Sequence, residues 1–353
     1  IVSMIGSGQA NRKLSDVPVF SLVFDGGADE SDYIAAVEDR FGFHAYRVDG
    51  SGISAFDDCD AITAEQDQPI PGPNIATLRY FIRTISRQSG VRILLDGHGG
   101  DEVVSYGNGI FQELAESGRW LRLWRELSAS EDLRPERGKL FWRLVRRWGL
   151  RSWRRWTGWL LKGKRRMDDP IRYTPDGHPR PTEQAAHLGK LSTPLYAYAL
   201  EALDHNAAAA GVEIRMPFMD VDLVSFCVTL PAHEKWASGV SRLIVRKALD
   251  GLLPPAVATR LDKFDFTDRI RSSMLAKHGE LIERTLRADA AELARFADLG
   301  DLRASWRMLQ EEGTLAGAKF QQIWRAVVLG RWLERQRNLT PYAFHSPVPE
   351  AAE

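Results

Sequence analysis

One short apolar run in this chain passes directly into a glycine-rich polar turn. Residues 91–95 read VRILL and residues 96–102 read DGHGGDE. A continuous apolar run of this length predicts a buried strand of a parallel sheet, and ligands of open α/β sheets bind where such strands end. Residues 96–102 are therefore the first place to expect a functional site.

The segments before this turn alternate between strand and helix. β-rich runs at 19–24 and 44–48 precede VRILL, and helical stretches at 31–42 and 74–90 separate them. This βαβ rhythm predicts a parallel sheet. Beyond about residue 110 the strand signals fade and helical periodicity dominates, so the second half of the chain is expected to be mostly helical.

The change of pattern divides the chain into four parts. We expect an α/β lobe over residues 1–118, a basic Trp-rich helical segment with a linker over 119–183, a helical carboxyl-terminal part over 184–340, and a tail over 341–353. The linker is expected at residues 167–183, where prolines and Asp-containing turn pairs interrupt the helical pattern.

Composition narrows the class of protein. No stretch of about 18 uncharged apolar residues is present, so no transmembrane segment is expected. Cys59 and Cys227 stand far apart and in no CxxC pattern, which favours a reducing compartment over a disulfide framework or a zinc site. The cytoplasm is the expected location.

The residue types in DGHGGDE suit the binding of a nucleotide. Gly97, Gly99 and Gly100 let the backbone turn sharply after the strand and bring its amides against a ligand. Asp101 and Glu102 follow at once, and adjacent carboxylates suit a divalent metal together with an acid/base group. The alternative is a glycine-rich turn with two solvated acids.

Three further features carry weaker signals. His98 is a candidate proton shuttle or ligand, but no second histidine stands at the spacing of a zinc site. In GVEIRMPFMDVDLVSF, residues 211–226, charged residues punctuate an apolar segment and either pair with one another or contact a ligand. Arg242 and Arg246 lie four apart on one helical face, a spacing that can present two cations to phosphate or carboxylate.

Positive charge and tryptophan are concentrated in one segment. Residues 119–166 carry sixteen Lys and Arg against four Asp and Glu, although the whole chain has no net formal charge. Such a segment could lie on an anionic membrane surface, hold a peptide substrate or partner, or bind nucleic acid, the last being least favoured. The alternative is a buried Trp and Leu stripe with Arg facing water. Seven of the eleven tryptophans lie in this segment: Trp120, Trp124, Trp142, Trp148, Trp153, Trp156 and Trp159.

Taken in order, these segments resemble the asparagine synthetase family, which includes β-lactam synthetases and lasso-peptide cyclases. FDGGADESDYIAAVEDRFGFH is similar to the family's strand, Asp-Glu, Tyr-Ala helix and Gly-x-His, EQDQPIPGPN to its Asp-Glu-Pro segment, and DGHGGDE to its Ser-Gly-x-Gly-x-Asp-Glu. DHNAAAAGVEIRMPFMD resembles its Asp-Arg to Pro-Phe-Leu-Asp pattern, and GVSRLIVRKALDGLLP with RLDKFDF resembles its closing pattern. The agreement is collinear over roughly residues 1–266.

The resemblance implies a fold and a nucleotide site. The fold is an α/β, parallel-sheet pyrophosphate-loop lobe, similar to the adenine nucleotide alpha hydrolases, followed by a mostly helical lobe. Leu22, Asp96 and Gly97 are implied to line the adenine and ribose site, with Gly99 beside them, and Asp101 to help hold Mg²⁺.

The resemblance also implies catalytic residues. Glu102 stands at an acid/base or orienting carboxylate near the reacting acyl group, and Arg242 stands where the family usually has a lysine that stabilises developing charge. Arg keeps the charge but cannot readily hand over a proton, because its guanidinium stays protonated in proteins. Arg246 and Lys263 match further basic positions.

Three departures from the family pattern qualify this reading. The family's Ser-Gly-Gly-x-Asp-Ser phosphate loop does not occur in residues 1–353, and we expect it immediately before Ile1. The family's glutaminase domain is not within these residues either, and we expect it further upstream. The Gly-Gly-Tyr that follows Asp-Glu in the family is SYGNG here, with Tyr106 one place early, which hints at a changed acyl substrate.

The predicted function is an ATP-dependent, AMP-forming amide ligase that uses ATP and Mg²⁺. Aspartate with glutamine-derived ammonia is the expected substrate pair. A cyclase for a ribosomal, lasso-like peptide is the alternative within the enzyme class, so the carboxylate substrate is a small molecule or a peptide. A scaffold that kept the fold without turnover is the alternative from another class. A homodimer or a partner protein is possible, whereas nucleic acid is not expected.

Overall fold

The computed structural model describes residues 1–8, 17–25, 30–70, 72–104, 107–130, 133–157, 182–261, 267–287, 290–313 and 317–338. The chain forms two compact units. The first contains Ile1–Asp49 and Thr84–Phe264, and the second contains Gly50–Arg83 and Asp265–Glu353. All the residues that the sequence assigns to the candidate site belong to the first unit. The four-part division predicted from the sequence stays a prediction.

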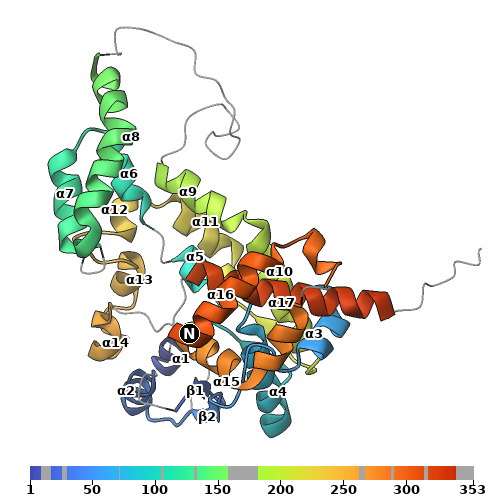
Figure 1. Ribbon diagram of the computed structural model, residues 1–353. Coiled ribbons are helices and arrows are strands. Elements are labelled where there is room, and N and C mark those ends of the chain that lie inside the picture. Colours follow the sequence, from blue (N-terminus) through green and yellow to red (C-terminus); the bar gives the residue numbers. More distant parts are fainter. Residues whose placement is uncertain are drawn as a thin grey trace, which may run out of the picture. The chain divides into compact units, whose positions relative to one another are not determined.

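The first unit holds every strand that the structure describes. Its elements are α1 (Val2–Gly6), β1 (Phe20–Val23), α2 (Ser31–Phe41), β2 (Tyr46–Asp49), β3 (Ile93–Leu95), α5 (Gly100–Val103), α6 (Gly109–Glu116), α7 (Trp120–Ala129), η2 (Arg134–Glu136), α8 (Arg137–Thr157), α9 (Thr182–Leu191), α10 (Pro194–Ala208), β4 (Glu213–Arg215), η4 (Pro217–Met219), α11 (Val221–Thr229), α12 (Ala232–Lys235), α13 (Leu243–Ala248) and α14 (Pro255–Thr259). Helices follow one another through the middle of the unit, in the green and yellow part of the chain (Figure 1).

The second unit contains helices and no strand among its described residues. Its elements are α3 (Cys59–Gln66), α15 (Thr267–Thr285), η5 (Leu293–Arg295), α16 (Leu299–Glu312) and α17 (Gly317–Asn338), and α4 (Ile75–Ser89) runs across the boundary between the units. Its core includes Phe320, Ile323 and Trp324 of α17, each at most 1% exposed. Helix α17 packs against α15, α16 and α3.

The predicted parallel pairing is confirmed, in two separate sheets. Strand β1 pairs with β2, and β3 pairs with β4, both in parallel. The mostly helical second half is also confirmed. Within the described residues the two sheets share no strand pairing, so the pyrophosphate-loop lobe with its continuous sheet stays a prediction.

Two details of the strand prediction were wrong. Strand β3 is not buried, because Ile93 and Leu95 are 48% and 46% exposed. Its one partner in the described residues, β4, is equally short, so the faces of this sheet are not covered as in a doubly wound fold. Strand β4 itself lies well beyond residue 110, where strand signals had been expected to end.

The Trp-rich segment divides between core and surface. Helices α6, α7 and α8 pack together, and Trp120 and Trp148 lie against a core that includes Leu123. Trp124 and Trp142, in contrast, are 41% and 63% exposed. The buried-stripe interpretation therefore holds for some tryptophans of the segment and fails for others.

Several predictions fall outside the described residues. They concern Tyr106, Lys263, Trp159, the tail at 341–353 and most of the linker at 167–183. The linker ends earlier than predicted, because α9 begins at Thr182 and its second residue, Glu183, is 1% exposed. No helix in the described parts of the chain is both long and apolar enough to cross a membrane.

Candidate active site

Strands β3 and β4 bring two of the sequence motifs together. Leu95 is in register with Arg215, and the Asp96 N–H donates to the Arg215 carbonyl at 2.9 Å. The turn 96–102 therefore leaves β3 at the point where PFMD, residues 217–220, leaves β4. This edge is where a parallel pair presents ligand-binding turns.

Gly99 is required at the centre of the turn. Its φ of +89° lies in the left-handed region, and a Cβ there would stand 2.6 Å from the Met219 Sδ. A side chain at Gly100 would stand 3.5 Å from the ring of Phe218, which is ordinary van der Waals contact. Both the conformation and the space therefore select glycine at position 99.

Asp96 and His98 form a polar pair within the turn. The Asp96 Oδ1 accepts from the backbone N–H of His98 at 2.7 Å and lies 2.5 Å from its Nδ1. Burial opposes ionisation of Asp96, but the hydrogen bonds and charge of His98 outweigh it and lower the pKa of the carboxyl. The hydrogen bond to Asp96, with help from the carboxylate charges and against burial, raises the pKa of His98. The imidazole, whose side chain is 38% exposed, is thus held by Nδ1 and made more basic.

Asp101 and Arg242, which are 141 positions apart, form an ion pair. The Arg242 Nη2 donates to the Asp101 Oδ1 at 2.9 Å, and the two side chains are 38% and 47% exposed. Arg242 precedes α13 with a φ of +57°, a backbone conformation that a non-glycine residue rarely adopts. The structure therefore joins the predicted metal carboxylate to the predicted catalytic cation.

Arg246 binds backbone carbonyl groups. Its Nε donates to the Ser241 carbonyl at 3.0 Å, Nη2 donates to that of Arg260 at 2.5 Å, and Nη1 donates to that of Ala258. Burial and the nearby Arg242 charge lower its pKa. These bonds fix the start of α13 to the end of α14, and the predicted catalytic role of Arg246 stays a prediction.

Arg260 connects the closing motif to the first one. Its Nη1 donates to the Glu30 carboxylate at 2.7 Å, and its guanidinium lies 4.1 Å from the centre of the Tyr33 ring. Glu30 and Tyr33 belong to the motif that precedes and begins α2. Segments more than two hundred residues apart in the chain are thus fixed to each other.

Residues 1–334 match the sequence profile of the asparagine synthase family. The chain belongs to the asparagine synthase family. A Mycobacterium bovis protein whose name gives a provisional glutamine-hydrolysing asparagine synthetase activity is 27% identical over 150 residues, which is 42% of this chain and 21% of that protein. Asparagine synthetase (glutamine-hydrolysing) of Gallus gallus is 32% identical over 97 residues, 27% of this chain and 17% of the relative. The matches thus span about a fifth of the relatives' length.

For this asparagine synthase family member, the structure places the predicted nucleotide residues on different sheets. Leu22 lies in β1 opposite Val48 of β2, whereas Asp96 and Gly97 follow β3. No strand pairing within the described residues connects these positions. Their shared role at an adenine and ribose site stays a prediction.

The described residues fit Mg²⁺ only in the manner of a nucleotide-bound ion. They contain no group of three or more His, Cys, Asp and Glu side chains that could hold a metal. Asp101 is a half-exposed carboxylate, and Mg²⁺ typically takes one or two protein carboxylates with the remaining positions filled by phosphate oxygens and water. Asp101 could hold such an ion together with ATP phosphates.

Sequence reasoning missed several residues beside the turn. Tyr196 donates to the Met219 Sδ at 3.1 Å, and burial, with the Glu102 charge, raises its pKa to about 12. The carbonyl of Glu102 lies 2.8 Å from the Nε2 of His187, whose Nδ1 is 3.0 Å from the Nζ of Lys235. None of the three stands in a recognisable motif, and only the fold brings them to the turn.

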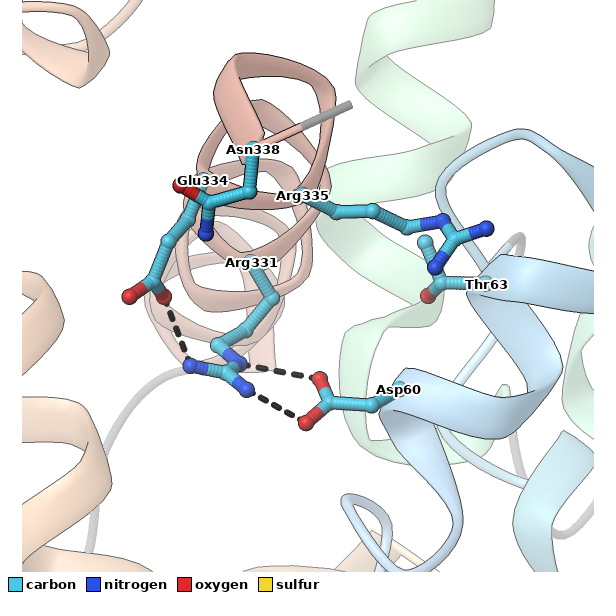
Figure 2. A pocket seen from close by; sticks show the side chains of 6 residues that line it. All are labelled: Asp60, Thr63, Arg331, Glu334, Arg335 and Asn338. Atoms are coloured by element: carbon cyan, nitrogen blue, oxygen red, sulfur yellow. Dashed lines mark hydrogen bonds and ion pairs between the residues drawn. The ribbon is translucent and has the colours of Figure 1, made fainter. Parts of the chain in front are cut away.

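A separate cavity of about 350 Å³ lies in the second unit, between α3 and α17 (Figure 2). Arg331 pairs there with Asp60, through two hydrogen bonds, and with Glu334 at 2.6 Å. The Arg335 side chain points toward Thr63 (Figure 2). The two arginines and two carboxylates of the lining balance each other, and none of the predicted site residues lines this cavity.

Proposed function

We propose that this chain is the synthetase part of an AMP-forming amide ligase. A carboxylate oxygen attacks the α-phosphate of ATP and pyrophosphate leaves; an amine then attacks the activated acyl carbon and AMP leaves. Aspartate and glutamine-derived ammonia are the proposed substrates, with a glutaminase domain expected upstream. The observation that carries the proposal is the DGHGGDE turn at the end of β3, with Asp101 paired to Arg242, in a member of the asparagine synthase family.

The proposal assigns roles to the charged residues of the turn. Asp101 holds Mg²⁺, which offsets the charge of the phosphates, and Arg242 stabilises the charge that develops as the amine attacks. Their ion pair keeps the Arg242 guanidinium beside the phosphate site. Glu102 orients the acyl substrate, and Arg246 supports Arg242 by fixing the start of α13. Gly97 and Gly99 allow the backbone to approach the nucleotide.

We assign the proton of the attacking amine to His98. Asp96 occupies the Nδ1 side of the ring, and Nε2 has no hydrogen-bond partner among the described residues. A general base must be held in one orientation, and the Asp96 contact holds the ring at Nδ1 and makes it more basic. Nε2 therefore accepts the proton that the amine loses when the amide bond forms.

A peptide carboxylate is the second candidate substrate. The exposed surface of α7 and α8 supports it, since Leu121, Trp124 and Trp142 are 80%, 41% and 63% exposed. Arg137 lies 5.5 Å from the centre of the Trp124 ring, so a cation borders the aromatic surface. Such a surface exceeds what free aspartate needs. A cyclase for a ribosomal peptide would use it to hold the part of the peptide away from the reacting carboxyl.

The test is the formation of AMP and pyrophosphate by the full-length protein with Mg-ATP, aspartate and glutamine. Asp101→Asn and Glu102→Ala remove the proposed site carboxylates, and Asp222→Asn is the matched control, because Asp222 is an exposed carboxylate in the first turn of α11. We expect aspartate-dependent AMP formation that the two site variants lose and the control keeps.

Other outcomes distinguish the alternatives. Turnover that appears only when a peptide is supplied, and that Trp142→Ser weakens through KM, would establish the cyclase. An absence of turnover with every carboxylate would refute the ligase and leave the scaffold, a homodimer or a complex with a partner protein, as the role of the fold.

A further inference from the structure

A chain of buried polar side chains lies against the back of the DGHGGDE turn. Glu183 and His187 stand one turn apart on α9, and Lys235 ends α12. Their exposed fractions are 1%, 0% and 2%. Glu and Lys are almost never buried to this extent unless they are paired, so the arrangement calls for an explanation.

Hydrogen bonds run from Glu183 to the turn. The Lys235 Nζ lies 3.3 Å from the Glu183 Oε1 and 3.0 Å from the His187 Nδ1. The His187 Nε2 lies 2.8 Å from the carbonyl oxygen of Glu102. At the other end the Gly109 N–H donates to the Glu183 Oε2 at 2.8 Å. The chain thus begins at the start of α6 and ends on α5, which packs against α9.

The partners dictate the proton positions. A carbonyl oxygen can only accept, so the His187 Nε2 carries the proton and donates to Glu102. The Nδ1 then accepts from the ammonium of Lys235, which can only donate. One tautomer of His187 satisfies both neighbours, and a doubly protonated ring would direct an N–H at the Lys235 cation.

The electrostatics agree with this assignment. Burial, and then the Lys235 charge, lower the pKa of His187 to about 4. Burial also lowers the pKa of Lys235, against the favourable charge of Glu183, and raises the pKa of Glu183. His187 therefore stays neutral through the ordinary pH range and acts as a permanent donor to Glu102, not as a proton carrier.

Glycines make room for this chain of contacts on the segment after α5. A Cβ at Gly109 would stand 2.4 Å from the Glu183 Oε2. A Cβ at Gly107, where φ is +146°, would stand 2.9 Å from the Trp236 Cβ and 3.0 Å from the Lys235 Cβ. The backbone just before α6 and at its first residue thus lies directly against the buried set.

The position of the contact gives it a function. Helix α5 is four residues long and carries Asp101 and Glu102 in its first turn. So short a helix makes few internal hydrogen bonds and cannot hold its own position. The bond from His187 is a tertiary contact that fixes the peptide group of Glu102 from the side opposite to solvent.

We propose that His187, held by Lys235 and Glu183, is a positioning residue that fixes α5 so that Asp101 and Glu102 keep the geometry of the active site. The inference rests on the proposed function for its catalytic consequence, but not for its structural one. His187 acts through the backbone of Glu102 and does not touch the substrate. Lys235 sets the tautomer of His187, and Glu183 keeps Lys235 charged.

The first experiment separates the hydrogen bond from packing. His187→Leu removes the donor, whereas His187→Gln keeps an N–H near the place of Nε2. His205→Leu is the control, because His205 is a half-exposed histidine on α10. In the full-length protein we expect His187→Leu to lower kcat at least tenfold with KM for Mg-ATP changed less than about threefold. His187→Gln should recover most of the loss, and equal losses in both variants would overturn the proposal.

The second experiment is independent of turnover. Amide hydrogen exchange of residues 100–104 reports on α5, whose N–H groups of Val103 and Val104 donate to the carbonyls of Gly99 and Gly100. We expect exchange at least tenfold faster in His187→Leu than in the parent or in His205→Leu, with His187→Gln close to the parent. Unchanged exchange would overturn the positioning role even in an active enzyme. If the parent protein shows no ATP turnover but His187→Leu still exchanges faster than the parent, the positioning role stands and only the proposed function is refuted.

Discussion

Removal of the buried Lys235 cation is the sharpest test of how Glu183, Lys235 and His187 stabilise one another. Lys235→Met keeps an unbranched side chain of similar length but leaves the Glu183 carboxylate, 1% exposed, without its ion-pair partner. Breaking a buried pair by removing one partner costs about 3–5 kcal/mol of unfolding free energy. We expect a loss in this range, because His187 Nδ1 loses its donor in the same step.

A second substitution tests the cause of that loss. Lys235→Met combined with Glu183→Gln removes the buried charge but keeps an oxygen that can accept from the Gly109 N–H. The double variant should therefore recover about half of the loss, a coupling of roughly 2 kcal/mol between the two positions. Lys247→Met is the control, since the Lys247 ion pair with Glu234 is at the surface, where water screens it and its loss should change stability little.

The loss should also depend on pH. The Lys235 charge lowers the pKa of Glu183, so its removal raises that pKa further above the unfolded value. A group with a raised folded pKa contributes stability that is present at low pH and lost as pH rises through that pKa. The deficit of Lys235→Met should therefore shrink as pH falls from 7 toward about 5. Urea unfolding at several pH values measures it, and a loss below about 1 kcal/mol at pH 7, or a deficit that grows on acidification, would refute the reasoning.

Three further outcomes follow from the turn itself. Gly99→Ala should lower ATP turnover at least tenfold and the unfolding free energy by about 1–3 kcal/mol, because the φ of Gly99 is +89° and Met219 blocks the space for a Cβ. The control is Gly138→Ala on α8, which has open space around it and should leave turnover unchanged. Arg242→Ala should lower kcat by about a hundredfold with less change in KM, and restoration by Arg242→Lys would show that charge alone suffices. Because Asp96 raises the pKa of His98, activity should rise with pH through that pKa, and Asp96→Asn should move the rise to lower pH; an unmoved profile would exclude His98 as the base.

Helices and strands were predicted correctly from the sequence where their side chains follow a regular apolar pattern. The helical stretch at 31–42 is α2, that at 74–90 is α4, and VRILL contains β3. The run GIFQELAESGRWLRLWREL, residues 109–127, has helical periodicity throughout but forms two helices, because Gly118 takes a φ of +70° and separates α6 from α7. A glycine in a helical pattern is ambiguous, and only tertiary packing decides whether the helix continues through it.

Strand β4 was not predictable by the same means. Its three residues, Glu213–Arg215, include two charged side chains that pair with each other at 2.8 Å, so neither apolar alternation nor a β-rich run is present. Its strand conformation comes from hydrogen bonds to β3, more than a hundred residues earlier. A strand can be recognised from its residue types only when its side chains are buried and therefore apolar, and the outer residues of both β3 and β4 are exposed.

For the candidate site too, the sequence predicted some features and only the structure showed the others. Asp101 and Arg242 entered the prediction through their places in family motifs, and the structure adds the contact that periodicity could not supply. Arg246 entered in the same way, yet its donors serve backbone carbonyls. A motif position tells which residues are near a site, whereas the hydrogen-bond partners tell what each can do there.

The buried polar set left one trace in the sequence. Glu183 fell within the predicted linker, and neither His187 nor Lys235 lies in a motif, because sequence patterns do not show which polar side chains are buried. The departure of SYGNG from Gly-Gly-Tyr was the visible anomaly. Gly107 and Gly109 both belong to this run. A side chain at Gly107 would collide with Lys235, and a side chain at Gly109 would collide with Glu183. The altered spacing therefore coincides with the space that the buried set requires.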